Sequence, residues 1–429
     1  MTDRTRRRWH LCAWLALYGA FAVAQPGSPQ ATGNVVSAVD GRPVAGAIVT
    51  RGGREVRTDA HGYFVLPRRN DCADSTIHVR APGFGRAALT PGCDAIEVPP
   101  VALPPVRPKA VYLSVYGISS QTLRDDALAL QHVTAINALV IDLKGDRGLT
   151  PYPSAARHAA GADGGAIKPP PRVQNFAALV SQLHARGLYL IARIVVFKDD
   201  PLATAHPEWA VRDARGNPWR DRENLRWIDP TIRAAWPHQL DIAEEAARLG
   251  FDEVQFDYLR FPDASGLRFS DPNTEANRVA AITGFLQAAR ERLRPYNVFL
   301  SADIFGYVCW NHDDTAIGQQ IETLGAAVDY ISPMLYPSGF TWGLPGCNRP
   351  TEHPGEIVGR SLAEARRRTG LPGVRFRPWL QAFRDYAFDR KPFEAAEIRE
   401  QVEAADGAGT DGWMLWNPRN RYDPDALPR

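Results

Sequence analysis

Three aspartates stand inside short apolar segments, at Asp142, Asp257 and Asp303. A carboxylate in an apolar strand costs free energy unless it is paired or functional. Two converging carboxylates can cleave a glycosidic bond without a cofactor, because one protonates the leaving oxygen while the other attacks the sugar or activates water. We therefore predict Asp257 and Asp303 as the catalytic pair and Asp142 as a third member. The alternative is that each acid only pairs with a neighbouring cation.

Further polar and aromatic residues accompany these acids. Side chains alternate across a strand, which places Lys144 on the face of Asp142 and Gln255 on that of Asp257. The polar candidates for substrate binding are Lys144, Arg193, Gln255 and Arg260. Large amphipathic rings suit the apolar faces of sugars, although core packing is the alternative for many of them. The aromatic candidates are Trp310, Tyr336, Trp342, Trp379 and Trp416.

Other chemistries find little support. The ten histidines are scattered, and no C-x-x-C or H-x₃-H spacing occurs, so we expect no metal and no cofactor. Phosphate-site glycines and a G-x-S-x-G motif are absent, which disfavours kinase and lipase functions. Lysine and arginine number 50 against 48 acids, so the charge gives no reason to expect nucleic-acid binding.

The elements that would position the acids alternate between short β-branched runs and helical stretches from residue 111 onward, which is typical of a parallel sheet covered by helices. Helical patterns lie at 232–249, 277–293 and 395–405. Eight such units predict an α/β fold, a (β/α)₈ TIM barrel, with the active site at the C-terminal ends of the strands. A doubly wound sheet is the alternative, but no G-x-G-x-x-G follows the first strand. The expected strands are 111–118, 138–144, 189–197, 253–261, 298–306, 330–336, 376–383 and 412–416.

Two long loops, 146–174 and 198–230, are expected to build the cleft, because loops of this length in a compact domain are usually functional. Ahead of the barrel, residues 33–103 show short strands between turn signals, the pattern of a small all-β sandwich. Prolines make 104–109 a stiff linker, so the barrel spans 110–424.

The chain of 429 residues begins with a basic stretch and an apolar run that ends in Ala-Val-Ala, which predicts a signal peptide at 1–24, followed by a spacer at 25–32. We therefore expect a periplasmic or extracellular monomer with no membrane span after signal removal. Four cysteines would remain in an oxidising compartment, with three possible pairings. We prefer the pairings within one domain, Cys72–Cys93 and Cys309–Cys347.

Several motifs carry a resemblance to known families. The barrel resembles the glycoside hydrolase family named domain of unknown function 4015, which implies a (β/α)₈ glycosidase-like barrel but gives no residue roles. Its motifs are Val-Ile-Asp-Leu-Lys-Gly at 140–145, His-Pro-Glu-Trp at 206–209, Phe-Asp-Tyr-Leu-Arg-Phe-Pro at 256–262, Ser-Ala-Asp-Ile-Phe-Gly at 301–306 and Ser-Pro-Met-Leu-Tyr-Pro at 332–337. Residues 33–103 resemble a carboxypeptidase regulatory-like, prealbumin-type domain through Asp-Gly-Arg-Pro-Val-Ala-Gly-Ala-Ile-Val at 40–49 and Thr-Asp-Ala-His-Gly-Tyr-Phe at 58–64.

Together these observations predict a secreted or periplasmic hydrolase that cleaves glycosidic bonds of a polysaccharide by a two-carboxylate mechanism. One alternative is a catalytically silent carbohydrate-binding barrel of the cell envelope, which would use the same aromatic residues. Another is a metal-dependent hydrolase or deacetylase, which would need a histidine and aspartate cluster that the spacing does not offer.

Overall fold

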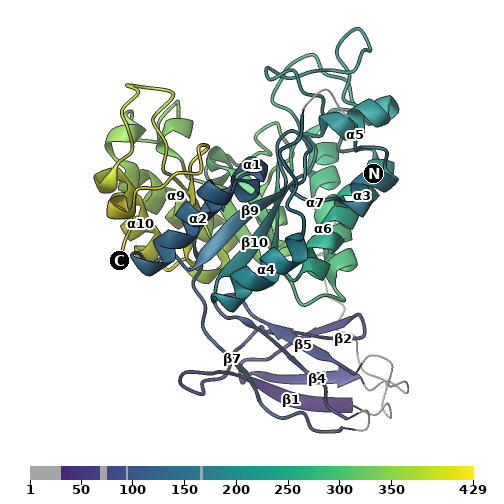
Figure 1. The fold of residues 1–429 in the computed structure, drawn as a ribbon, viewed down its shortest axis with the longest axis vertical. Coiled ribbons are helices and arrows are strands. Elements are labelled where there is room, and N and C mark those ends of the chain that lie inside the picture. The colour runs from purple at the N-terminus through teal and green to yellow at the C-terminus, as the bar shows by residue number, and fades with distance from the viewer. Residues whose placement is uncertain (1–29, 68–74, 93–94, 165–167) are drawn as a thin grey trace, which may run out of the picture.

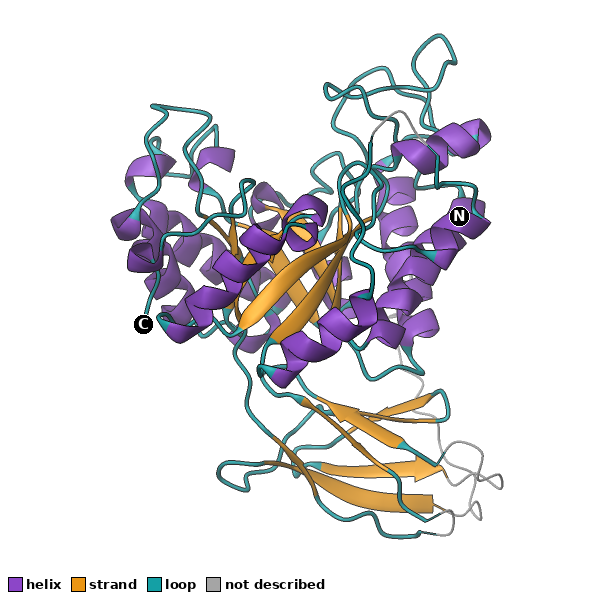
Figure 2. Cartoon of the chain, viewed as in Figure 1, coloured by secondary structure: helices purple, strands orange, loops and turns teal. Residues whose placement is uncertain are grey.

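The computed structural model describes residues 30–67, 75–92, 95–164 and 168–429. The predicted signal peptide and the predicted Cys72–Cys93 pair lie outside the described residues. Two domains follow one another along the chain, an all-β domain and a barrel ringed by helices (Figure 1, Figure 2). No helix in the described part of the chain is long and apolar enough to cross a membrane.

The N-terminal domain is built from two small sheets packed around one apolar core. One sheet has the order β4-β1-β7 and the other β3-β2-β5-β6. Alternation along β4, where Phe64 and Leu66 point inward and Tyr63 and Val65 outward, is what places one face of the sheet on the core. The strands are β1 Gln30–Ser37, β2 Ile48–Arg51, β3 Arg54–Arg57, β4 Tyr63–Pro67, β5 Ile77–Arg80, β6 Arg86–Leu89 and β7 Val101–Leu103.

The second domain is a closed barrel of eight parallel strands in the order β8 to β15, with β15 pairing back onto β8. This confirms the predicted (β/α)₈ fold. All seven residues of β9 are buried, because its odd-numbered side chains pack under the helices and its even-numbered ones fill the barrel interior. The strands are β8 Lys109–Leu113, β9 Ala138–Lys144, β10 Tyr189–Val195, β11 Glu253–Asp257, β12 Phe299–Phe305, β13 Tyr330–Met334, β14 Trp379–Gln381 and β15 Trp413–Trp416.

Helices surround the barrel, as Figure 2 shows. The predicted helices at 232–249, 277–293 and 395–405 correspond to α6, α7 and α10. The first predicted strand, 111–118, is too long: Ser114 caps a short helix through Gly117 N, which ends the strand at Leu113. The α-helices are α1 Val115–Ser119, α2 Gln121–Ala129, α3 Ala155–Ala159, α4 Phe176–Ala185, α5 Asp200–Ala205, α6 Trp236–Leu249, α7 Glu275–Leu293, α8 Ile321–Ala327, α9 Pro354–Thr369 and α10 Ala395–Gly407.

The N-terminal domain sits against the end of the barrel where the strands begin, below it in Figure 1. Arg86 on β6 donates to the carbonyl oxygens of Phe251 (3.1 Å) and Asn297 (2.5 Å) and pairs with Asp252, all just ahead of β11 and β12. Arg80 on β5 lies 3.6 Å from a carboxylate oxygen of the residue preceding β13. The opposite end of the barrel is therefore left open.

The predicted Cys309–Cys347 disulfide is wrong, because both residues are free thiols in the structure. Cys309 lies in the 3-10 turn that follows β12, and both side chains are buried in the apolar layer outside the barrel. Burial raises the pKa of Cys309 to about 12. Each sulfur thus packs as a small apolar group.

Candidate active site

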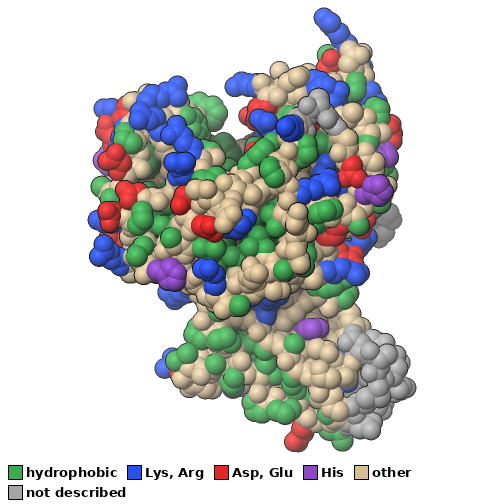
Figure 3. All heavy atoms as spheres, viewed as in Figure 1, with side chains coloured by type: hydrophobic (Ala, Val, Ile, Leu, Met, Phe, Trp, Pro, Cys, Tyr) green, Lys and Arg blue, Asp and Glu red, His purple; other side chains and the backbone are tan. Residues whose placement is uncertain are grey.

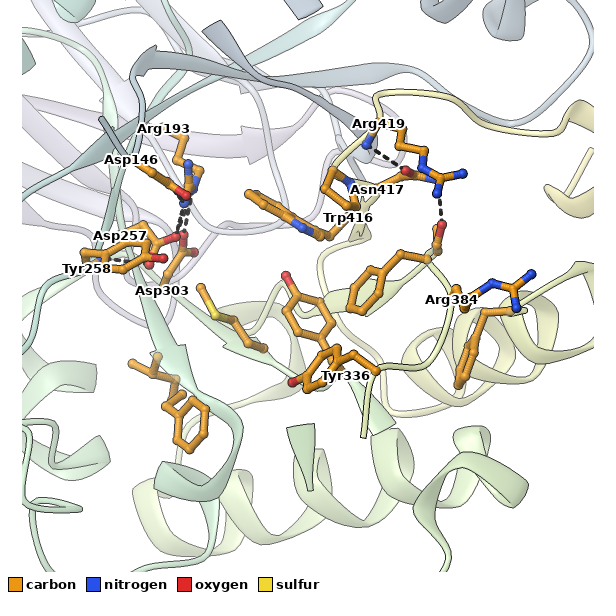
Figure 4. Close-up of a pocket in the computed structure, with 18 of the residues that line it drawn as sticks. Asp146, Arg193, Asp257, Tyr258, Asp303, Tyr336, Arg384, Trp416, Asn417 and Arg419 are labelled. Carbon is orange, nitrogen blue, oxygen red and sulfur yellow. Dashed lines mark hydrogen bonds and ion pairs between the residues drawn. The ribbon is translucent and has the colours of Figure 1, made fainter. Parts of the chain in front are cut away.

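Arg193 on β10 is the hub of a cluster of acids at the C-terminal mouth of the barrel. Its guanidinium lies 2.6 Å from Asp142 Oδ1, 3.2 Å from Asp146 Oδ1 and, through Nε, 2.9 Å from Asp257 Oδ2. A second nitrogen of the guanidinium also bonds Asp257. Figure 4 shows Arg193 above Asp257 and Asp303, with Asp146 beside it. The buried cation thus holds acids from three neighbouring segments in one place.

Asp303 on β12 lies beside the guanidinium of Arg193. Its Oδ1 accepts a 2.8 Å hydrogen bond from Trp379 Nε1, whereas its Oδ2 has no hydrogen-bond partner in the described chain and lies 3.9 Å from Arg193 Nε. Burial raises the pKa of Asp303 well above its usual value, and the neighbouring carboxylate of Asp257 adds to the rise. The surroundings of Asp303 therefore favour its protonated form, whereas Asp257 accepts two hydrogen bonds from a cation.

Asp142 on β9 is buried and is another of the acids that contact Arg193. Its Oδ2 accepts a 2.6 Å hydrogen bond from the hydroxyl of Tyr112, so both carboxylate oxygens are occupied. Burial raises its pKa to about 6, against the opposing effect of Arg193. It does not line the cavity described next, so its place is behind Arg193, where it orients the guanidinium.

A cavity of about 770 Å³ opens over Asp257 and Asp303. That volume lies within the range typical of small-molecule sites. Its lining combines acids, arginines and aromatic rings from the ends of several strands and the loops after them. The lining residues are Asp146, Arg193, Asp257, Tyr258, Arg260, Asp303, Ile304, Phe305, Gln319, Met334, Tyr336, Ala382, Phe383, Arg384, Tyr386, Pro392, Phe393, Trp416, Asn417, Pro418 and Arg419.

Tyr258, directly after the strand end, has a backbone φ of +48°, which is uncommon for a residue with a side chain. Its amide donates a 2.5 Å hydrogen bond to Oδ1 of Asp257, and its ring lies under the Arg260 guanidinium at 5.2 Å. Unfavourable backbone conformations of this kind persist where the surroundings over-determine them and cluster at functional sites. The turn fixes the orientation of the Asp257 carboxylate.

Several residues predicted from the sequence meet at this cavity. Arg193, Arg260, Tyr336 and Trp416 line it together with the two predicted catalytic aspartates. Trp416 stacks on Tyr112 with ring centroids 3.9 Å apart, and the Arg193 guanidinium lies 4.9 Å from its ring.

Two predicted ligands support the site from within the barrel. Gln255 is fully buried and donates to Ser332 Oγ at 3.2 Å, one layer below Asp257. Trp379 is equally buried, donates a hydrogen bond to Asp303 and packs edge-to-face on Trp416, with ring centroids 5.5 Å apart. Neither side chain lines the cavity, so both are positioning residues.

The remaining predicted ligands lie elsewhere. Lys144 is fully buried with its ammonium 2.5 Å from Asp199 Oδ2, because β9 shifts register against β10 at its end and sends Lys144 away from the cavity. Trp310 donates to Ser361 Oγ at 2.9 Å and packs on α9. Trp342 is 84% exposed beside Tyr307 and outside the cavity lining.

The expected loops contribute little to the cavity. Of the described part of 146–174, only Asp146 lines it, and 198–230 contributes no lining residue. The segments 382–393 and 416–419 line it instead. Asp385 organises the first of these, since it accepts hydrogen bonds from Ser338 Oγ (2.6 Å) and from three backbone amides of its own loop. The sequence signal for this loop is the run Phe-Arg-Asp-Tyr at 383–386 between a strand and a helix.

A set of three or more histidine, cysteine or acidic side chains arranged to hold a metal ion does not occur among residues 30–67, 75–92, 95–164 and 168–429. The carboxylates that line the cavity, Asp146 and Asp257, are paired with the guanidinium of Arg193, and Asp303 lies 3.9 Å from it.

Fold and site together define a glycoside hydrolase-like barrel. Residues 110–422 match the family described as "Putative glycosyl hydrolase domain", domain of unknown function 4015, and the chain belongs to that family. The PgaB (BpsB) glycoside hydrolase domain from Bordetella bronchiseptica shares the fold, with 16% identity, a TM-score of 0.54, and coverage of 76% of this chain and 99% of that one.

Two further solved structures are similar to this chain. A hypothetical protein from Ruminiclostridium thermocellum ATCC 27405 is 36% identical over 45% of this chain and 96% of that one, with a TM-score of 0.39. A chitinase from Chromobacterium violaceum ATCC 12472 is 13% identical over 74% and 96% of the two chains, with a TM-score of 0.45. No curated protein matches the chain.

Proposed function

We propose that this protein is a secreted or periplasmic glycoside hydrolase that cleaves a polysaccharide, with Asp303 as general acid and Asp257 as base or nucleophile. The observation that carries the proposal is the unequal environment of these two neighbouring carboxylates. Asp303 is buried, has a raised pKa and has one oxygen without a hydrogen-bond partner among the described residues, whereas Asp257 is bonded to a guanidinium. Environments that separate the pKa values of two carboxylates assign the acid and the base.

The proposed reaction uses these two groups in turn. The proton on Asp303 Oδ2 passes to the glycosidic oxygen as the bond to the anomeric carbon breaks. The carboxylate of Asp257 then bonds the anomeric carbon, or takes a proton from the water that attacks it. Arg193 pairs with Asp257 and lies 3.9 Å from Asp303, so one guanidinium contacts both acids. Tyr336 and Trp416 line the same cavity and offer ring faces to the sugar.

The experiment is the release of reducing ends by the purified protein from a panel of bacterial and plant polysaccharides, beside Asp257→Asn and Asp303→Asn. Circular dichroism establishes that both variants are folded. We expect a loss of about 10²- to 10⁴-fold in each variant, the usual contribution of a positioned acid or base. Equal release by wild type and both folded variants would refute the assignment.

A silent carbohydrate-binding barrel is the second candidate, and one observation favours it. Asp257 Oδ2 receives two hydrogen bonds from Arg193, which lowers the reactivity of that oxygen as a nucleophile. In that case the wild type would bind a glycan without releasing reducing ends, and both asparagine variants would bind equally well.

A further inference from the structure

Two arginines without carboxylate partners lie across the cavity from the catalytic pair. Arg384 and Arg419 line the cavity, and Figure 4 places both on the side away from Asp257 and Asp303, with Trp416 and Tyr336 in between. Among the described residues, no ion pair involves Arg384 or Arg419, and the same is true of Arg260. Figure 3 shows further basic side chains on both sides of the hollow at the barrel mouth.

The two segments that carry these arginines are fastened to each other. Asn417 donates through Nδ2 to the carbonyl oxygen of Ala382 at 2.7 Å, and its Oδ1 accepts from the amide of Arg419 at 2.9 Å. Arg384 in turn donates through Nη1 to the carbonyl oxygen of Arg390 at 3.0 Å, within its own loop. The backbone segments that carry the two exposed arginines are therefore fixed relative to each other, and less backbone entropy is lost when the arginines bind a ligand.

The charge at this end of the cavity is uncompensated. The acids that line the cavity are Asp146, Asp257 and Asp303, and all three lie at the guanidinium of Arg193. The hydroxyls of a neutral sugar carry no charge that would balance two guanidiniums without a carboxylate partner among the described residues. A guanidinium presents a planar fork of donors that matches a carboxylate in a bidentate fashion.

We propose that the cavity takes an anionic glycan, and that Arg384 and Arg419 bind the carboxylate of a uronic acid residue while the bond to be cut lies at Asp257 and Asp303. This inference rests on the proposed glycosidase function and names the substrate class of the same site. The aromatic rings between the two ends of the cavity would carry the intervening sugar faces.

The test measures binding, so that it does not depend on turnover. Asp303→Asn is titrated by calorimetry with polymers that contain uronic acids, here called polyuronates, namely polygalacturonate, alginate and hyaluronan, and with the same polymers after reduction of their carboxyl groups to alcohols. The reduced polymers keep length and linkage but carry no charge. We expect at least one polyuronate to bind about 10- to 100-fold more tightly than its reduced form, the effect of losing one or two charge-assisted hydrogen bonds.

Matched variants locate the effect. The double variant Arg384→Gln, Arg419→Gln should lose the preference for the charged polymer and keep its affinity for the reduced one. Arg390→Gln is the control, because Arg390 is exposed on the same loop and does not line the cavity. Arg390→Gln should prefer the charged polymer over the reduced one as strongly as the parent protein does. Substitutions of exposed arginines rarely affect folding. If Asp303→Asn does not fold, Asp257→Asn serves as the parent protein instead.

Three results would overturn the proposal: equal affinity for charged and reduced polymers, binding of none of the polyuronates, or a preference that survives in the double variant. Tighter binding of chondroitin sulfate than of unsulfated chondroitin would replace the carboxylate by a sulfate ester as the recognised anion. If the wild type binds polyuronates selectively and releases no reducing ends, the glycosidase proposal fails while the anionic ligand stands. If the wild type hydrolyses neutral polymers and shows no preference for charged ones, the glycosidase proposal stands while the anionic ligand is refuted.

Discussion

The indole nitrogen of Trp379 donates a 2.8 Å hydrogen bond to Oδ1 of Asp303, so this contact distinguishes the two oxygens of the carboxyl group. The other oxygen, Oδ2, has no hydrogen-bond partner among the described residues and belongs to a side chain that lines the cavity. The donor also opposes the rise in the Asp303 pKa that burial and Asp257 cause. Trp379 therefore both orients the acid and limits its pKa.

Replacing Trp379 by Phe should move the alkaline limb of the kcat/KM profile to higher pH. The substitution removes a hydrogen bond that favours the ionised carboxylate, so the pKa of Asp303 rises further. A hydrogen bond of about 1 kcal/mol corresponds to a shift of about 0.7 pH units. The measurement is the pH dependence of kcat/KM on the polysaccharide that the panel identifies.

Trp413→Phe is the control for that experiment. Trp413 is as buried as Trp379, but its indole nitrogen has no hydrogen-bond partner in the described chain and its ring packs outside the barrel. The same loss of volume should therefore destabilise the fold without moving the profile. A limb that stays in place in Trp379→Phe, or that moves to lower pH, would contradict the role given to the indole.

Replacing Arg193 by Met should destabilise the fold by about 3–5 kcal/mol, the usual cost of removing one partner from buried ion pairs. The substitution leaves Asp142 and Asp257 buried beside each other without their common cation. Urea denaturation measures the free energy of unfolding. Arg367→Met is the control, since the exposed pair of Arg367 with Glu364 should contribute less than about 1 kcal/mol. Equal stability of both variants would show that Arg193 is not the hub of the acids.

Much of this site was predictable from the sequence, because the active site of a (β/α)₈ barrel lies at the C-terminal ends of its strands. Asp257 and Asp303 were assigned to predicted strands and Arg193 falls within the predicted strand 189–197, and parallel strands bring their C-terminal ends to one mouth of a barrel. The eight strands were all anticipated, with errors only at their boundaries. Whether these residues act in the assigned roles stays a prediction.

The failures have a common physical cause, which is that alternation along a strand stops where regular pairing stops. Lys144 was assigned to the face of Asp142, but a register shift beside Arg193 turns it toward Asp199. The loop 382–393 owes its shape to Asp385 and to Ser338 from another strand end, a tertiary contact that no local pattern encodes. Loop length alone therefore pointed to the wrong segments.

Replacing Arg86 by Ala should lower the free energy of unfolding by about 1–3 kcal/mol, because the carbonyl oxygens of Phe251 and Asn297 and the carboxylate of Asp252 lose a shared donor. Turnover should not change, since these contacts lie at the end of the barrel opposite the cavity. Calorimetry and a reducing-end assay on the same sample measure both quantities. Unchanged stability would mean that the two domains are not coupled through Arg86.

Cys309 and Cys347 should remain free thiols in the purified protein. Burial, with a pKa of Cys309 near 12, keeps this thiol protonated and unreactive, so iodoacetamide should label it only after denaturation. The protein is alkylated either before or after unfolding, and mass spectrometry of its tryptic peptides measures the extent of labelling at each cysteine. A peptide pair linked through these two residues would restore the disulfide that the sequence suggested.

The roles of the two acids can be separated by the leaving group of the substrate. A dinitrophenolate departs without protonation, so Asp303→Asn should hydrolyse the dinitrophenyl glycoside of the identified sugar within about tenfold of the wild-type rate while losing about 10²- to 10⁴-fold on the polymer. Asp257→Asn should lose both activities, because the anomeric carbon still needs a nucleophile or an activated water. The free oxygen and raised pKa of Asp303 motivate this assignment, as does the bonding of Asp257 to Arg193. If Asp257→Asn is instead the variant that keeps activity on the activated substrate, the two roles are exchanged, and Arg193 then holds the acid rather than the base.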